Sequence, residues 1–239
     1  MGDGRMTATP DALGPARAAV GAGVVAALLL PVVVLWDGAT RGDGYDTTVH
    51  WISLLSLGSR GALGRAALLV PGVCFVAAAV GMGRLARACR GSVGHCPQLA
   101  FAWAIGCMGT AMVVAFAFPI DPVPSYPVGS PSSPMTATGF LHTLAGCAVV
   151  VSAAVACGVG AWVVRTWWAF AGSILVCATV VWRMGRTVVD ASDHDGIWEA
   201  ADAGLNQRIS VFSALAWIAV LCLVVVRRDV AGRGSARTP

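Results

Sequence analysis

Residues 18–36 read AAVGAGVVAALLLPVVVLW, a run with no charged side chain. A helix needs about 20 apolar residues to cross the roughly 30 Å hydrocarbon core of a bilayer, so this stretch predicts a membrane-spanning helix. Arg5 and Arg17 precede the run, as they would in a secretory signal. Further apolar runs follow it, and they favour a first helix that is retained.

Five further runs have the length of a membrane span, at residues 63–82, 99–118, 139–159, 167–184 and 209–226. Charged residues make up 12% of the chain, against about 25% in soluble domains. Pro31 and Pro71 lie inside the first two runs, where neighbouring helices can satisfy the freed carbonyls. The sequence predicts an all-α, polytopic bundle of six transmembrane helices in the cell membrane. Its expected parts are a cytosolic segment 1–17, a membrane domain 18–226 and a cytosolic basic tail 227–239.

The arginines predict the orientation of the bundle. All 16 basic residues are Arg, and cytoplasmic loops of membrane proteins are enriched in basic residues. Ten of them share one side of the expected topology with both termini, which we therefore expect in the cytosol: Arg5, Arg17, Arg84, Arg87, Arg90, Arg165, Arg227, Arg228, Arg233 and Arg237.

Most acidic residues fall in the three outer connections. The second connection, after residue 118, is rich in proline, which argues against regular structure there. In the third, Asp195 is typical of an N-cap for a short helix that carries Trp198. The acidic residues expected outside are Asp37, Asp43, Asp46, Asp121, Asp190, Asp193, Asp195, Glu199 and Asp202.

Polar residues cluster at the outer ends of several spans at once. Ionisable groups at membrane depth cost about 2.5–3.5 kcal/mol each unless they are paired, so a shared outer pocket is the hypothesis. Helix ends also attract such residues because water and headgroups are near, which is the structural alternative. Candidate catalytic residues are Asp121, His142, Asp46 and Asp190, and candidate substrate-binding residues are Arg183, Arg186, Gln207, Arg208, His50, Trp51 and Trp182.

We also expect a pairing within this pocket. Asp121 or Asp190 should lie within hydrogen-bond or ion-pair reach of His142, Arg186 or Arg208.

The sequence indicates no cofactor and no metal site. It has no H-E-x-x-H pair, and most of its eight cysteines lie inside apolar runs, where Cys packs as a small hydrophobe. The arginines form no basic stripe with interleaved aromatics, so nucleic-acid binding is not expected.

Four short motifs lie at the outer ends of the spans: YDTTVHWISLLSLG at 45–58, FPIDP at 118–122, TGFLH at 138–142 and LNQRI at 205–209. In these motifs and their spacing the chain resembles a bacterial and archaeal six-helix membrane family catalogued as domain of unknown function 998. The resemblance implies six helices with a polar outer rim, and it implies no activity.

Two functions stay open. The first is a membrane enzyme that cyclises an apolar isoprenoid by protonation, with Asp121 as the acid, His142 as its partner and tryptophans lining the pocket. The alternative is a non-enzymatic lipid-binding, transport or accessory protein whose arginines contact a phosphate. The expected partner is a membrane lipid or an apolar small molecule, and the oligomeric state is left open.

Overall fold

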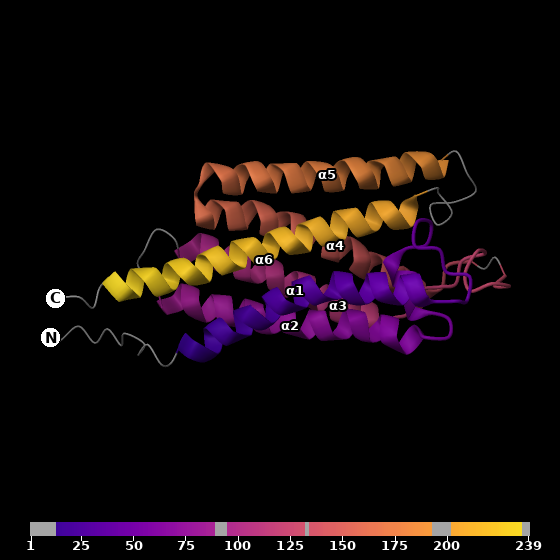
Figure 1. The fold of residues 1–239 in the computed structure, drawn as a ribbon, viewed down its shortest axis with the longest axis horizontal. Coiled ribbons are helices and arrows are strands. Elements are labelled where there is room, and N and C mark those ends of the chain that lie inside the picture. Colours follow the sequence, from indigo (N-terminus) through magenta and orange to yellow (C-terminus); the bar gives the residue numbers. More distant parts are fainter. Residues whose placement is uncertain (1–12, 89–94, 132–133, 193–201, 236–239) are drawn as a thin grey trace.

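A computed structural model describes residues 13–88, 95–131, 134–192 and 202–235 (Figure 1). Within these ranges the chain is all α, with one short 3-10 helix, η2, at Ile52–Ser56. The six long helices are α1 Gly14–Thr40, α2 Gly61–Ala88, α3 His95–Ala117, α4 Ala137–Val164, α5 Trp167–Ser192 and α6 Ala203–Ser235. Each is long and apolar enough to cross a membrane.

The long axes of the six helices are roughly aligned, and the start of α1 lies at the same end of the bundle as the end of α6 (Figure 1). We call this end the terminus end. The opposite end carries η2 and the irregular residues 118–131 and 134–136, and we call it the loop end. Helices α1 to α4 pack successively, and α6 lies against α1, α4 and α5. Helix α5 is at the edge of the bundle in Figure 1 and packs mainly on α4 and α6.

The six predicted long apolar helices are confirmed, and they extend beyond their apolar runs. Helix α1 continues past Trp36 to Thr40, so that it contains the buried Asp37, and α6 begins at Ala203 rather than at Ile209. These extra turns carry polar side chains to the loop end. The proline-rich connection is irregular, as predicted, apart from an isolated bridge between Val123 and Tyr126.

Small residues set how closely the helices approach one another. A Cβ atom on Gly109 of α3 would lie 2.6 Å from the carbonyl oxygen of Gly72 in α2, closer than such contacts allow. Glycine at this crossing lets the two backbones touch, which is how helices associate in lipid. The core around it contains Phe75, Phe101 and Met108.

Candidate functional site

A network of polar and aromatic side chains covers the loop end. We call it the polar cap, and it consists of Asp37, Arg41, Asp43, Tyr45, His50, Arg60, Tyr126 and Arg208. Its residues come from α1, α6 and the connections after α1 and α3. The cap therefore joins segments that are far apart in the sequence.

Arg41 lies at the centre of the cap and its side chain is inaccessible to solvent. Its Nη1 donates to the carbonyl of Leu57 at 2.6 Å and to the hydroxyl of Tyr126 at 2.9 Å. Its Nη2 donates to Oδ2 of Asp37 at 2.7 Å and to the carbonyl of Leu55 at 2.8 Å. Such a planar, multiply bonded guanidinium is a site that Lys could not reproduce.

Asp37 holds two arginines at once. It pairs with Arg41 one turn later on the same chain and with Nε of Arg60 at 3.2 Å. Arg60 also donates to the carbonyl of Asp37 and lies over the ring of Trp36, 5.4 Å from its centroid. A buried carboxylate needs such partners, because removing one leaves an uncompensated charge.

Tyr126 links Arg41 to Asp43 through its hydroxyl, which accepts from the first and donates to Oδ2 of the second at 3.0 Å. Burial acts to raise the pKa of Asp43, but hydrogen bonds from Tyr126 and Ser59 outweigh it and the net pKa is lowered. Burial raises the pKa of Tyr126. At neutral pH the link therefore joins a charged carboxylate to a neutral phenol.

Arg208 attaches the connection after α1 to α6. Its Nη1 donates to the carbonyls of Thr47, His50 and Gly204, and its Nη2 donates to the hydroxyl of Tyr45 at 2.5 Å. Backbone hydrogen bonds from Gly204 to Val49 and from Leu205 to Thr48 continue this contact. Burial raises the pKa of Tyr45 to about 12.

His50 completes the cap. Its Nδ1 accepts from the backbone N–H of Asp46 at 2.8 Å, so its Nε2 carries the proton and faces Oγ of Ser125 at 3.2 Å. The rings of Tyr45, His50 and Tyr126 lie within 5.4 Å of one another. The charge of Asp46 is stabilised by hydrogen bonds from Thr48, which lower its pKa.

His142, the second predicted catalytic residue, caps the end of α3. Its Nδ1 bonds to the carbonyls of Ala115 at 3.0 Å and Phe118 at 2.8 Å. In a continuing helix these carbonyls would accept from the residues four positions later, and those are Pro119 and Pro122, which have no N–H. The imidazole N–H thus replaces the backbone N–H donors that are missing at the two prolines.

Asp121, the first predicted catalytic residue, anchors the start of α4. It accepts from the backbone N–H of Thr136 at 2.8 Å and from its hydroxyl at 2.6 Å. Thr136 is the N-cap of α4 and accepts from the N–H of Gly139. A Cβ on Gly139 would collide with the Asp121 carboxylate, so glycine allows this approach to the positive end of the helix.

Of the expected pairings, the one between Asp121 and His142 is not formed. The carboxylate binds the helix N-cap, and the imidazole binds backbone carbonyls instead. The motifs FPIDP and TGFLH are in contact through two separate links. Asp121 binds Thr136 at the start of α4, and His142 of α4 binds the carbonyls at the end of α3. The side chain of Asp190, and residues 193–201 with the Asp195 N-cap, lie outside the described residues.

The other predicted site residues are distributed unevenly. Gln207 accepts from the backbone N–H of Ile52 at 2.6 Å, and Trp51 packs against Ala203. Arg183 donates to Oδ1 of Asn206 at 3.1 Å. Trp182 and Arg186 are exposed on α5.

A small central cavity of about 90 Å³ lies among α1, η2, α2, α3, α4 and α6. His142 and Gln207 both line it, together with Ser53 and apolar side chains. These are the two predicted site residues that the structure brings to one cavity.

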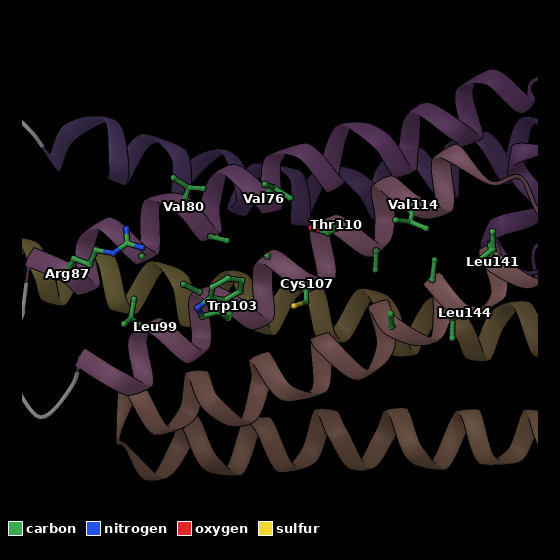
Figure 2. A pocket seen from close by; sticks show the side chains of 17 residues that line it. Val76, Val80, Arg87, Leu99, Trp103, Cys107, Thr110, Val114, Leu141 and Leu144 are labelled. Atoms are coloured by element: carbon green, nitrogen blue, oxygen red, sulfur yellow. The ribbon is translucent and has the colours of Figure 1, made fainter.

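A second space is a larger apolar groove along α2, α3 and α4, with a volume of about 730 Å³ (Figure 2). Trp103, Cys107 and Thr110 lie along it, and Leu141 and Leu144 are at its loop end. Arg87 extends over its other end (Figure 2). The groove is a feature that the sequence did not indicate.

Sequence reasoning also missed part of the cap. Asp37 is expected only as one of the outer acidic residues, and Arg41, Tyr45 and Tyr126 are not among the predicted site residues. Two signals could have found them. Asp37 and Arg41 are four positions apart, as an ion pair on one helix face would be. The chain has only two tyrosines, Tyr45 and Tyr126, and both fall in outer connections.

Six apolar helices closed at one end by a buried polar network define a multi-pass membrane protein of the helical-bundle class. The chain belongs to the family described as protein of unknown function DUF998, which it matches over residues 24–224. No curated protein and no solved structure matches it.

Proposed function

We propose that the protein binds a long-chain lipid with an anionic headgroup. The hydrocarbon chain occupies the apolar groove between α2, α3 and α4, and Arg87 binds the headgroup. The observation that carries the proposal is an open, almost wholly apolar groove of about 730 Å³ that ends at a guanidinium (Figure 2). This volume is within the 300–1,000 Å³ of typical ligand sites.

Arg87 suits a headgroup because it lies in the last turn of α2 and is exposed. Within the described ranges its side chain has no hydrogen-bond or ion-pair partner. A guanidinium binds phosphate oxygens in pairs, so a phosphate is the anion that fits best.

The length of the groove favours one long chain. From Leu99 to Val114 it follows α3, which is about 22 Å at 1.5 Å per residue. One leaflet contributes only about 15 Å of the roughly 30 Å hydrocarbon core. A single polyprenyl chain can follow the whole groove, whereas the acyl chains of a glycerophospholipid end near the bilayer centre.

The observations favour lipid binding over cyclisation. A proton-initiated cyclase needs an acid beside a cavity that holds a prenyl chain, and the central cavity has about 90 Å³. An engineered apolar cavity of about 150 Å³ binds benzene or xenon, which are much smaller than a prenyl chain. Asp121, the proposed acid, acts as an acceptor for Thr136.

The experiment is native mass spectrometry of delipidated protein mixed with a polyprenyl phosphate, phosphatidylglycerol or phosphatidylcholine. We expect one polyprenyl phosphate to be retained per chain. Arg87→Gln should weaken retention about tenfold, the loss of one charge-assisted contact. Arg84→Gln, on the same exposed helix end but outside the groove, should not.

A steric variant tests the groove itself. A Cβ on Gly83, which lines the groove, meets no atom within 4 Å, and the same is true of Gly185 on α5, which does not line it. Gly83→Leu should reduce retention and Gly185→Leu should not. Equal retention of all three lipids by all variants would overturn the proposal, and a dimer broken only by Gly83→Leu would show that a second copy fills the groove.

A further inference from the structure

The central cavity combines apolar walls with a few polar groups. Its volume is about 90 Å³, and Val34, Leu68, Met112 and Phe212 form part of its wall. Ser53, His142 and Gln207 contribute the polar atoms. The cavity lies at the loop end, since Gln207 directly precedes the cap residue Arg208.

His142 presents an acceptor to this cavity. The side chain is only 2% exposed. Its Nδ1 must carry a proton, because both of its partners are backbone carbonyls, which only accept. In the neutral ring Nε2 then holds a lone pair, and it has no partner in the part of the chain that the structure describes.

Gln207 presents a donor to the same cavity. Its Oε1 accepts from the N–H of Ile52 at 2.6 Å, which fixes the orientation of the amide and leaves its NH₂ group for the cavity. No described residue accepts from this group. Both side chains line the cavity, and among the described residues neither Nε2 of the buried His142 nor the NH₂ group of the half-buried Gln207 has a hydrogen-bond partner. Native proteins satisfy nearly all of their buried polar groups, so the bare Nε2 of His142 points to a ligand.

We propose that the central cavity is a binding site for a small hydroxyl compound, which is water or a short-chain alcohol. Its O–H donates to Nε2 of His142, and its oxygen accepts from the NH₂ group of Gln207. A water needs about 10–15 Å³ of such space, so the cavity has room for a few waters or one small alcohol. The apolar wall contacts the alkyl part of an alcohol.

The test uses the full chain in lipid nanodiscs with ¹⁵N-labelled histidine. The signal of His142 among the four histidines is assigned from its loss in His142→Asn. We expect a neutral ring protonated at Nδ1, a hydrogen-bonded Nε2, and a magnetisation-transfer cross peak to water. Added ¹³C-propan-2-ol distinguishes the two sources, because a cross peak to the alcohol in place of water identifies an alcohol site.

Filling the cavity should remove the signal. Gly146 lines the cavity, and a Cβ there meets no atom within 4 Å. Gly146→Leu should abolish the cross peak, while Gly158→Leu, on the same helix but outside the cavity and equally unhindered, should retain it. If Gly146→Leu fails to fold, Gln207→Leu provides the test, and it should weaken the cross peak. An Nε2 without a hydrogen bond and without either cross peak, or a ring protonated on both nitrogens, would overturn the proposal.

Discussion

The hydroxyl of Tyr45 accepts a hydrogen bond of 2.5 Å from Arg208, although 163 positions separate the two residues. The same hydroxyl donates to the carbonyl of Trp51 at 2.9 Å. The connection after α1 is thereby attached to the first turns of α6 and not only to its neighbours in sequence. Because this contact is buried, the pKa of Tyr45 is raised and the phenol stays neutral well above its ordinary pKa.

The first prediction concerns alkaline pH. The pKa of Tyr45 is raised from 10.0 to about 12, so its contribution to stability is complete below pH 10.0 and is lost as pH rises toward about 12. In Tyr126→Phe, Tyr45 is the one remaining tyrosine. Its tyrosinate absorbance should appear well above pH 10.0 in the folded protein and near pH 10.0 in denaturant. Ionisation near pH 10.0 in both states would contradict the buried contact.

The second prediction concerns acid. The pKa of Asp43 is lowered from 3.8, so its contribution to stability is complete above 3.8 and is lost as pH falls through the lower folded value. The midpoint temperature of thermal unfolding in detergent should therefore decrease as the pH is lowered through this range. Asp43→Asn should lower the midpoint at neutral pH and flatten part of the acid dependence. An unchanged acid profile in this variant would exclude Asp43 as a source of it.

The third prediction tests the role of His142. His142→Phe leaves the carbonyls of Ala115 and Phe118 without a donor, which should cost about 1–3 kcal/mol for each buried group. Pro119→Ala restores an N–H that can reach Ala115. The cost of His142→Phe should therefore be smaller in the Pro119→Ala background, as measured by a double-mutant cycle of unfolding free energies. Additive costs would show that the proline and the histidine are independent.

The fourth prediction separates the anchoring role of Asp121 from chemistry. Asp121→Asn keeps a carbonyl oxygen that can accept from Thr136, whereas Asp121→Ala keeps none. We expect Asp121→Ala to destabilise the protein by about 0.5–2 kcal/mol, the range for a lost N-cap contact, and Asp121→Asn to cost less. The measurement is thermal unfolding with assays of lipid retention. Loss of lipid retention in a stable Asp121→Asn would contradict a purely structural role.

Hydropathy was enough to predict the six helices, because each apolar run matches the thickness of a bilayer. It predicts that the first helix ends at Trp36, because Asp37 is the first charged residue after the apolar run. In the structure the helix continues, because Arg41 and Arg60 neutralise Asp37. A hydropathy profile treats each charge alone and cannot represent such a pair.

The convergence of polar residues at one end was predictable, but their partners were not. The roles of Pro119 and Pro122 were readable in principle, because each proline leaves a known carbonyl without its donor. The groove was not readable, since lipid-facing ridges and hollows are equally apolar. Only the packing of α2, α3 and α4 distinguishes Trp103 in a groove from Trp182 on an open face.

The histidine cap on α3 also constrains how the chain is assembled. Until His142 is in place, the carbonyls of Ala115 and Phe118 have no internal donor, and hydrocarbon offers none. An α3 helix inserted alone would therefore have two carbonyls without hydrogen-bond donors at its end. The third and fourth helices form a hairpin in which these carbonyls are satisfied, so we expect the two helices to enter the bilayer together during biosynthesis.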